Sequence, residues 1–284
     1  MCDSTCRTAH EGDYQLEGVG FRVAISSLEA SPATRPAEAN AAPSFYRRLA
    51  RPEEKARLEK LGAVFNGVGM VLMPVPAGEF TMGSKEHRFE VPAHKVKITK
   101  AFLIGATEVT QAQWKAVMGE NTSVFKGDDL PVENVSWEEC QTFLKKLSEK
   151  EGKTYRLPTE AQWEYACRAG SGKRYSFGDD AAELGDHAWY DTNSDTQTHP
   201  VGLKKPSDWG LYDMYGNVSE WCQDTYAAYE DKEQTDPSGP EKPGQRVVRG
   251  GAWYNLSNLC RSAVRGARRP GDRYYFGLRV VLVP

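Results

Sequence analysis

The sequence predicts a loop-rich α+β domain that combines short strands with a few helices. Among its 284 residues there are 26 glycines and 16 prolines, the strongest local markers of turns and loops. The 7 tryptophans supply large anchors for a buried core. Short segments of alternating hydrophobicity are typical of strands, and three capping boxes mark the starts of helices. These features disfavour a helical bundle.

Two short stretches near the beginning of the chain recur at its end. The stretch CRTA (6–9) matches CRSA (260–263), and GFRV (20–23) matches GLRV (277–280) in the same order. Self-similarity of this kind indicates a repeated structural unit. We therefore expect residues 1–25 to be a partial repeat of the C-terminal end of the main domain; the alternative is a chance match.

Three further segments follow the expected partial repeat. Residues 26–43 are rich in alanine, proline and serine without apolar periodicity, so a linker is expected there. Residues 44–69 are charged with spaced leucines, which predicts a short helical segment that ends near Gly62. The main domain is expected over residues 70–284.

The main domain should begin with strands and continue with helices. Residues 70–84 and 94–105 alternate apolar and polar side chains between prolines and glycines, which predicts strands and hairpins. Helices should begin where a hydroxyl residue is followed three positions later by Gln or Glu: Thr110 with Gln113, Ser136 with Glu139, and Thr159 with Gln162. Beyond Gly170 we expect loops, with short strands at 246–248 and 277–282.

The charge and hydropathy of the chain argue against two classes of partner. There are 36 Lys and Arg against 39 Asp and Glu, with no basic block, so nucleic acid is not expected as a partner. No run of about 18 apolar residues is present, so no membrane partner is expected. The first residues lack a basic segment followed by an apolar one, which predicts a cytoplasmic protein.

Charged residues in two places are expected to be structural. One helix carries three of them at positions i, i+4 and i+8, which predicts an exposed or semi-buried ion-pair ladder: Glu160, Glu164 and Arg168. Three arginines cluster around the Gly250-Gly251 turn, and guanidinium groups in such a position are expected to act as forks to carboxylates: Arg249, Arg261 and Arg265.

Seven motifs together resemble the formylglycine-generating enzyme, or sulfatase-modifying factor, family. They occur in the family's order: PAGEFTMGS (76–84), TEVTQAQWKAVMG (107–119), LPVENVSWEEC (130–140), YRLPTEAQWEYACRAG (155–170), WGLYDMYGNVSEWCQD (209–224), VVRGGAW (247–253), and CRSAVR with GLRVV (260–281). The resemblance covers about three quarters of the chain and implies an irregular α+β fold of the C-type-lectin-like kind.

The family's founding enzyme implies a copper site that this sequence does not reproduce. That enzyme oxidises a cysteine of sulfatases to formylglycine, using two cysteines spaced C-x4-C that bind copper(I). If the family motif is aligned by counting forward from Gly250, the first copper-binding cysteine falls on Asn255 and the second on Cys260. If it is aligned by counting back from Arg265, Cys260 matches neither copper-binding cysteine. An amide cannot replace a thiolate ligand of Cu(I). Copper is therefore not expected, and formylglycine synthesis is disfavoured.

Cys260 remains the one candidate for a catalytic residue, with a structural role as the alternative. The resemblance places Cys167 and Cys260 near each other, either as a disulfide or as two packed thiols. In the structural role, Cys260 packs in the core; in the catalytic role, its thiolate is redox-active.

The segment DMYGNVSEW (213–221) resembles a calcium site of the same family. By position, the ligands would be the Asp213 side chain, the carbonyls of Gly216 and Val218, and the Glu220 carboxylate. Carboxylates mixed with carbonyls suit a hard cation such as Ca²⁺. The alternative is a salt-bridged glutamate in a tight turn.

Three functions remain open. The first is a calcium-stabilised, non-oxidase member of the family that binds a protein, peptide or carbohydrate. The second is a divergent oxidase that modifies a cysteine in a sulfatase or another protein. The third is a variable binding protein of a diversity-generating retroelement, because the closing pattern RGG-x-W…CRSA-x-R…G-x-R-V is shared, and residues 254–259, 264 and 272–276 avoid the residue types that adenine mutagenesis excludes.

The loss of the copper pair favours the first function. Tyrosine- and asparagine-rich loops on a rigid scaffold suit a recognition surface. Six residues near the C-terminus are therefore expected to contact the ligand: Trp253, Tyr254, Asn255, Asn258, Tyr274 and Tyr275.

Overall fold

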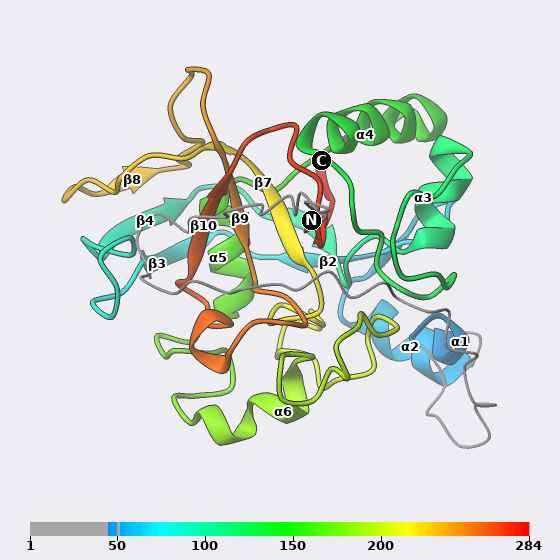
Figure 1. Ribbon diagram of the computed structural model, residues 1–284, viewed down its shortest axis with the longest axis horizontal. Helices are drawn as coiled ribbons and strands as arrows, with labels where there is room; N and C mark the ends of the chain where they lie inside the picture. Colours follow the sequence, from blue (N-terminus) through cyan, green and yellow to red (C-terminus); the bar gives the residue numbers. More distant parts are fainter. Residues whose placement is uncertain (1–44, 50–51, 284) are drawn as a thin grey trace, which may run out of the picture. The chain divides into compact units, whose positions relative to one another are not determined.

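The computed structural model describes residues 45–49 and 52–283 (Figure 1). The expected partial repeat at 1–25 and the expected linker at 26–43 lie outside the described residues. The segment expected to be helical contains α1 (Phe45–Leu49) and α2 (Pro52–Lys60), followed by the short strand β1 (Val64–Phe65). No helix in the described part of the chain is long and apolar enough to cross a membrane.

The largest sheet joins strands from both ends of the main domain. Its order is β1-β2-β5-β12-β6, and all neighbours are antiparallel. The strands that join β1 in this sheet are β2 (Val71–Val75), β5 (Phe102–Gly105), β12 (Val281–Val283) and β6 (Thr154–Arg156). Strand β12 lies between β5 and β6 and pairs with both, so the last strand connects two segments that come earlier in the sequence.

A second sheet, with the order β10-β9-β7-β11, carries the loops of the candidate site. Its strands are β10 (Arg265–Arg268), β9 (Arg246–Arg249), β7 (Ser219–Thr225) and β11 (Phe276–Gly277). The first three are antiparallel, and β11 is parallel to β7. A third sheet has the order β3-β4-β8 and consists of β3 (Gly78–Met82), β4 (His94–Ile98) and β8 (Gln234–Thr235).

All three predicted capping boxes are confirmed. They begin α3 (Gln111–Met118), α4 (Trp137–Glu151) and α5 (Glu160–Arg168). In each capping box, the side-chain hydroxyl of the N-cap residue accepts a hydrogen bond from the backbone N–H of the residue three positions later. The Gln or Glu side chain of that later residue accepts a hydrogen bond from the backbone N–H of the N-cap residue. Shorter helical turns follow at η1 (Ala181–Glu183), α6 (Leu184–His187) and η2 (Ser257–Leu259).

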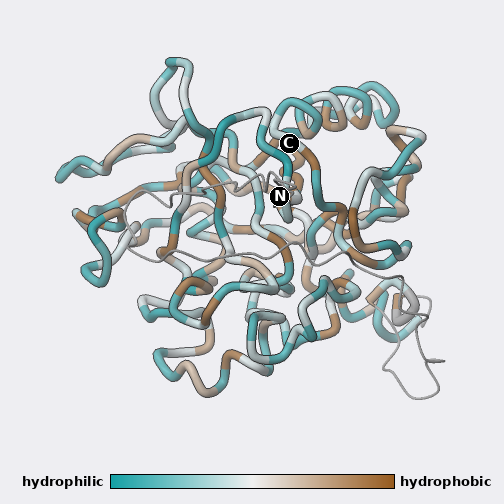
Figure 2. Tube along the Cα trace, in the orientation of Figure 1, coloured by the Kyte–Doolittle hydropathy of each residue, from teal (hydrophilic) through white to brown (hydrophobic). Residues whose placement is uncertain are grey.

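The core forms where these helices pack on the sheets. Helix α4 buries one apolar face, formed by Cys140, Phe143, Leu144 and Leu147, and apolar and polar residues alternate along this helix in Figure 2. The Trp114 ring of α3 stacks on the Phe143 ring of α4 with centroids 4.8 Å apart. Helix α5 lies against β3, β7 and β9, and its Trp163 is fully buried.

Two expectations about the strands are wrong. Strand β7, the longest of the second sheet, lies in a region where only loops were expected. The strand expected at 277–282 is split into β11 and β12, because the backbone between them bonds elsewhere: the N–H of Gly105 donates to Val280 O (2.8 Å) and that of Val109 to Leu278 O (2.9 Å).

Of the expected exposed or semi-buried ion-pair ladder, only the Glu164–Arg168 step forms, and it is buried, whereas Glu160 pairs with Arg265 instead. Glu160, Glu164 and Arg168 are 4 %, 0 % and 6 % exposed, and Arg168 Nη2 lies 2.7 Å from Glu164 Oε1. The expectation of an exposed or semi-buried ladder is wrong because the second sheet covers this face of α5. Arg249 from that sheet pairs with Glu164, and Arg265 Nη2 lies 2.6 Å from Glu160 Oε2.

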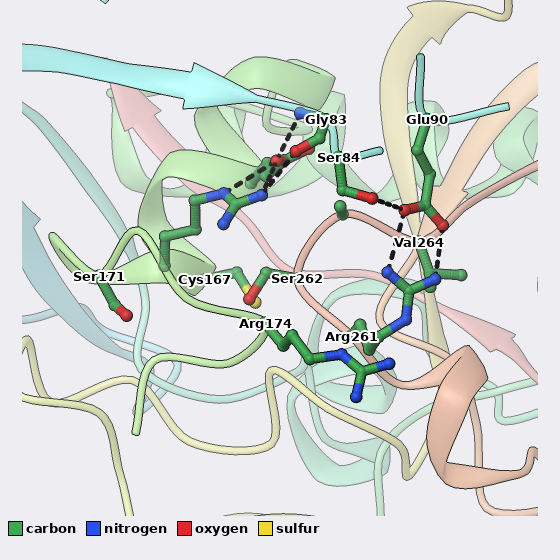
Figure 3. A network of polar contacts seen from close by, with 12 residues as sticks. Gly83, Ser84, Glu90, Cys167, Ser171, Arg174, Arg261, Ser262 and Val264 are labelled. Atoms are coloured by element: carbon green, nitrogen blue, oxygen red, sulfur yellow. Dashed lines mark hydrogen bonds and ion pairs between the residues drawn. The ribbon is translucent and has the colours of Figure 1, made fainter. Parts of the chain in front are cut away.

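The expectation that the arginines around the Gly250-Gly251 turn are structural forks is confirmed. Arg249 and Arg265 hold the two glutamates of α5. Arg261 binds both carboxylate oxygens of Glu90, with distances of 2.7 and 3.0 Å (Figure 3). Ser84 donates to the same carboxylate. All three arginines therefore form buried ion pairs with glutamates, and these ion pairs hold the segments around the Gly250-Gly251 turn in place.

Candidate functional site

Five aromatic side chains from three separate loops form an aromatic cluster: Phe125, Trp253, Tyr254, Tyr274 and Tyr275. Phe125 belongs to the loop after α3, Trp253 and Tyr254 follow β9, and the two other tyrosines precede β11. All five are half-buried. The structure therefore brings together four of the six residues that were expected to contact a ligand, and adds Phe125.

The rings of the aromatic cluster contact one another directly. The centroids of Tyr274 and Tyr275 are 4.3 Å apart, and those of Trp253 and Tyr275 are 4.8 Å apart with the planes at 71°. Tyr254 lies 5.7 Å from Tyr274, and Phe125 lies 5.8 Å from Tyr275. Edge-to-face pairs at these distances are favourable. The cluster is thus a preformed group of half-buried aromatic rings in contact with one another.

Backbone contacts fix the loops that carry the cluster. The N–H of Trp253 donates to Asn217 O (2.9 Å), and its carbonyl accepts from Ser194 Oγ (2.8 Å). On the other side, the N–H of Asn134 donates to Tyr274 O at 2.6 Å. Rigid loops lose little entropy on binding, which favours recognition.

The two asparagines that were expected to contact the ligand lie in the same loop as Trp253 but make other contacts. The carbonyl of Asn255 accepts from the N–H of Asp191 at 3.1 Å. The carbonyl of Asn258 accepts from Arg261 Nε at 2.9 Å. The side chain of Asn258 is exposed, so it remains available at the rim.

Two exposed apolar side chains extend the surface. Among the described residues, Leu256 is 57 % exposed and Val124 is 53 % exposed, and both lie in loops that carry the aromatic cluster. Exposed apolar side chains that gather beside aromatic rings are typical of a protein or ligand contact.

A buried carboxylate lies behind this surface. Glu133 is fully buried, its Oε1 accepts from the N–H of Phe125 at 3.0 Å, and its Oε2 has no hydrogen-bond partner. Burial raises the pKa of Glu133 from 4.5 to about 7. The charge of Glu133 also contributes to the raised pKa of Tyr275, after burial. Sequence reasoning missed this residue, and the PVEN motif gives no signal that its glutamate is buried.

We expect the substitution Glu133→Gln to stabilise the protein more at pH 8 than at pH 5. Between pH 4.5 and about 7 the folded protein keeps a proton on Glu133 that the unfolded chain releases. The free energy of unfolding therefore falls as the pH rises through this range, by up to about 3 kcal/mol from this group. Glutamine has no such proton. Urea unfolding of both proteins between pH 5 and 8 tests this, and a pH-independent difference would contradict it.

Cys260 packs beneath the loop of Trp253. Its thiol is free and fully buried, and burial raises its pKa to about 12. A Cβ added to Gly251 would lie 2.8 Å from Cys260 Sγ, so the turn closes tightly over the sulfur. Cys167 is also free and buried, which removes the disulfide alternative. Neither thiol is accessible as a thiolate at neutral pH.

The expected calcium ligands lie at the start of β7 and in the turn before it. Glu220 is fully buried and its carboxylate is already bonded: Arg279 Nη2 donates to Oε1 (2.8 Å) and Trp163 Nε1 donates to Oε2 (2.7 Å). Asp213 Oδ2 accepts from the N–H of Gly202 (2.6 Å), whereas its Oδ1 is buried without a partner. Burial raises the pKa of Asp213 to about 6.

Glu108 is a second carboxylate in this region that sequence reasoning missed. It is 1 % exposed, and neither of its carboxylate oxygens has a hydrogen-bond partner. Burial and the charge of Asp213 raise its pKa well above the ordinary value.

Across the described part of the chain, no three His, Cys, Asp or Glu side chains converge on one metal position. A cation here would therefore need carbonyl or water ligands as well, which Ca²⁺ accepts. The orphaned Asp213 oxygen fits such an ion, and the saturated Glu220 carboxylate does not.

Comparison with known families identifies the domain. The family model described as the sulfatase-modifying factor enzyme 1-like domain matches residues 62–283. This match begins shortly after α2 and ends at the last described residue, so it includes all three sheets and the aromatic cluster.

Three relatives illustrate what this domain is similar to. Chaperone protein LppX of Paenibacillus barcinonensis is 33% identical over 218 residues, which cover 58% of this chain and 74% of that protein. A formylglycine-generating enzyme of Thermomonospora curvata is 35% identical over 182 residues, 57% of this chain and 58% of that enzyme. In three dimensions, Treponema denticola variable protein 1 matches with a TM-score of 0.74 at 33% identity, covering 78% of this chain and 98% of that chain.

Proposed function

This chain belongs to the formylglycine-generating enzyme (sulfatase-modifying factor) family, and we propose that it is a calcium-stabilised binding member of that family rather than an oxidase. The expected C-type-lectin-like α+β fold is confirmed by the match to solved structures of the same type. A shared fold does not carry activity with it, so the function is argued from the site.

The burial of the Cys260 thiol disfavours oxidase chemistry. Copper(I) needs accessible thiolates, whereas this thiol is fully buried with a pKa raised to about 12. Asn255 stands five residues before it, where the family spacing would require a second cysteine. The described residues supply no other nucleophile within the aromatic cluster.

The aromatic cluster supports binding as the alternative activity. It consists of Tyr, Trp and Phe rings, and the exposed side chains of Leu256 and Val124 belong to the loops that carry these rings. Large, rigid aromatic side chains give much contact area for little loss of conformational entropy. A protein, peptide or carbohydrate ligand fits such a surface, and calcium at Asp213 would stabilise the fold that presents it.

We expect no oxidation of a peptide cysteine. The recombinant chain is loaded with Cu(I) and incubated in air with a sulfatase-motif peptide, and the formylglycine-generating enzyme of Thermomonospora curvata serves as the positive control. Mass spectrometry should show aldehyde only in the control. Aldehyde formed by this chain would establish the divergent oxidase instead.

A separate binding experiment compares substitutions of two exposed leucines. Ligands are selected from a glycan array and a peptide display library, and affinities are then measured for two variants. Leu256→Ala should weaken binding severalfold, because Leu256 is exposed and lies two residues after Tyr254 in the same loop. Leu61→Ala should leave affinity unchanged, since Leu61 is similarly exposed (43 %) but directly follows α2, outside the loops that carry the cluster. Equal effects of the two substitutions would count against this surface.

A second candidate, the variable binding protein, is favoured by one specific observation. The stretches 254–259 and 272–276, which both satisfy the adenine-mutagenesis pattern, meet in the structure through Tyr254 and Tyr274, whose rings lie 5.7 Å apart. The match to Treponema denticola variable protein 1 covers nearly all of that chain. Sequences from independent isolates distinguish the candidates, because replacements confined to these stretches would assign the chain to the variable class.

A further inference from the structure

A cavity of about 410 Å³ lies at the end of the second sheet that is opposite to the aromatic cluster. Thr225, the last residue of β7, and Arg246, the first residue of β9, line this cavity, whereas the cluster follows the other end of β9. The loop between β8 and β9 (Figure 1) and the turn after β10 supply three prolines and one residue of each charge: Pro240, Pro243, Pro270, Lys242 and Glu241. We call it the proline-lined cavity, and its volume is typical of small-molecule sites.

Hydrogen bonds hold the residues of the proline-lined cavity in place. Thr225 Oγ1 donates to Lys242 O (2.9 Å), which ties the loop before β9 to the end of β7. The N–H of Trp137 donates to Pro270 O (2.9 Å), which ties the turn after β10 to α4. Each proline also has a fixed φ. The cavity is therefore preformed and loses little entropy when a ligand binds.

The guanidinium group of Arg246 is fixed in orientation but retains unused donors. Its Nη1 donates to Gln223 O (3.0 Å) and to Thr225 Oγ1 (3.2 Å), and its central carbon lies 3.9 Å from the centre of the Trp137 ring. Its Nε is buried without an acceptor, and its Nη2 donates to no described residue. Buried donors without partners are unfavourable. The Nε–Nη2 edge of this group thus lacks the pair of acceptors that a carboxylate supplies.

The second sheet carries two cross-strand pairs of arginines, and only one pair is neutralised. Arg249 lies opposite Arg265, and Arg246 lies opposite Arg268. Because side chains alternate along a strand, the two pairs lie on opposite faces of the sheet. The glutamates of α5 bind the first pair, whereas neither Arg246 nor Arg268 forms an ion pair with a residue that the structure describes. Like charges in such positions repel, and a bound anion would relieve this repulsion.

The acidic groups around the cavity do not compensate Arg246. Burial lowers the pKa of Arg246, and the charges of Asp224 and Glu138 do not offset this effect. Burial also raises the pKa of Asp224 to about 7, so this group is only partly ionised at neutral pH. Glu241 and Lys242 are exposed residues of opposite charge in the lining. A ligand that reaches Arg246 should therefore bring a negative charge of its own.

We propose that the proline-lined cavity binds the carboxylate of a small organic acid, with Arg246 as the anchor, Lys242 as a second cation and the prolines against the apolar part of the ligand. A planar guanidinium matches a carboxylate through two parallel hydrogen bonds. This site goes beyond the proposed function, because it shares no residue with the aromatic cluster or with the expected calcium ligands.

Fluorine NMR titration of the full chain tests the anchor. The probe is 4-fluorobenzoate, and 4-fluorobenzamide is its neutral analogue of nearly the same shape. We expect the benzoate to bind at least tenfold more tightly than the benzamide. Arg246→Gln should weaken benzoate binding at least tenfold, and Arg246→Lys at least threefold, because lysine keeps the charge without the planar pair of donors. Equal affinities for the two probes would overturn the proposal.

The matched control is Arg156→Gln. Arg156 is also half-buried, its pKa is also lowered by burial, and it forms no ion pair with a described residue. It donates instead to Leu157 O (2.8 Å) and Gln162 Oε1 (2.7 Å), and it does not line the cavity. Its replacement should leave the benzoate affinity unchanged. An equal loss in Arg156→Gln and Arg246→Gln would contradict the assignment of the anchor.

A second variant and a second anion complete the test. Should Arg246→Gln fail to fold, Lys242→Gln on an exposed side chain replaces it; we expect severalfold weaker binding, and an unchanged affinity would contradict the proposal. The other anion is 4-fluorophenyl phosphate, which should bind no more tightly than the benzoate. Tenfold tighter binding of the phosphate would overturn the carboxylate assignment and identify a phosphate site.

Discussion

The substitution Glu164→Gln is expected to lower the free energy of unfolding by about 3–5 kcal/mol. Glu164 is fully buried on α5 and accepts from both Arg168 (2.7 Å) and Arg249. Glutamine has almost the same size, so no cavity forms. However, two buried guanidinium groups lose their closest carboxylate, and an uncompensated buried charge is far more costly than a lost surface contact. Equilibrium unfolding in urea measures the difference.

The control is Glu59→Gln on α2. Lys55 and Glu59 form an i, i+4 pair like Glu164 and Arg168, but their side chains are 53% and 52% exposed. The same substitution should cost no more than about 0.5 kcal/mol there. The spacing is the same and the substitution is the same, whereas burial and the number of arginine partners differ. Similar losses at both sites would show that the buried network contributes little.

A double variant tests the charge argument. Adding Arg249→Met to Glu164→Gln removes one of the two uncompensated cations, so the double variant should lose less stability than the sum of the single losses. Arg249 Nη1 also donates to the carbonyl of Ala263 at 2.9 Å. The network therefore fixes the segment that leads from Cys260 into β10, at the base of the candidate site.

Local sequence signals predicted α3, α4, α5 and the first strands correctly, whereas α6 lies in a region where loops were expected. Each capping box depends on residues only three positions apart, so Ser136 and Glu139, for example, identify the start of α4 without knowledge of the rest of the fold. The apolar face of α4 follows from its own periodicity in the same way. In both cases the determining contacts lie within one element.

Strand β7 could not be predicted from local signals. Its residues are buried on both faces, and two of them, Glu220 and Asp224, are charged. Alternation is therefore absent, and the polar residues suggest a loop. Glu220 is compensated by Arg279, fifty-nine residues later in the chain. Only the tertiary structure reveals that this charge is paired and that the strand lies at the centre of its sheet.

Sequence patterns predicted the part of the candidate site that consists of aromatic residues in loops near the C-terminus, and these side chains are half-buried. Four expected residues meet as proposed, because the turn after β9 and the turn before β11 enter the same sheet. Phe125 was missed because its ring contacts depend on the distant residues Trp253 and Tyr275, and Glu133 and Glu108 were missed because their burial follows from the tertiary structure. No local pattern distinguishes a glutamate that will be buried without a partner from one on the surface.

The substitution Gly216→Ala is expected to destabilise the domain by about 3 kcal/mol or more. Gly216 has a φ of +77°, and a Cβ there would lie 2.0 Å from the carbonyl oxygen of Trp189. Its N–H donates to Gly250 O at 2.8 Å, so the residue lies between two backbone segments. Overpacking costs about 1–3 kcal/mol when side chains can move, and a backbone carbonyl has less freedom to move. The left-handed conformation adds about 1 kcal/mol.

The matched control, Gly119→Ala, separates the two contributions. Gly119 caps α3 with a φ of +88°, but no atom lies within 4 Å of the position that a Cβ would occupy. Alanine there should cost only about 1 kcal/mol, from the backbone conformation alone. Because Gly250 leads directly into the loop of Trp253, Gly216→Ala should also change the near-UV circular dichroism of the aromatic cluster, whereas Gly119→Ala should not. Equal losses of stability in chemical unfolding would show that the Trp189 segment moves aside freely, and that the close approach of these backbones does not hold the loop in place.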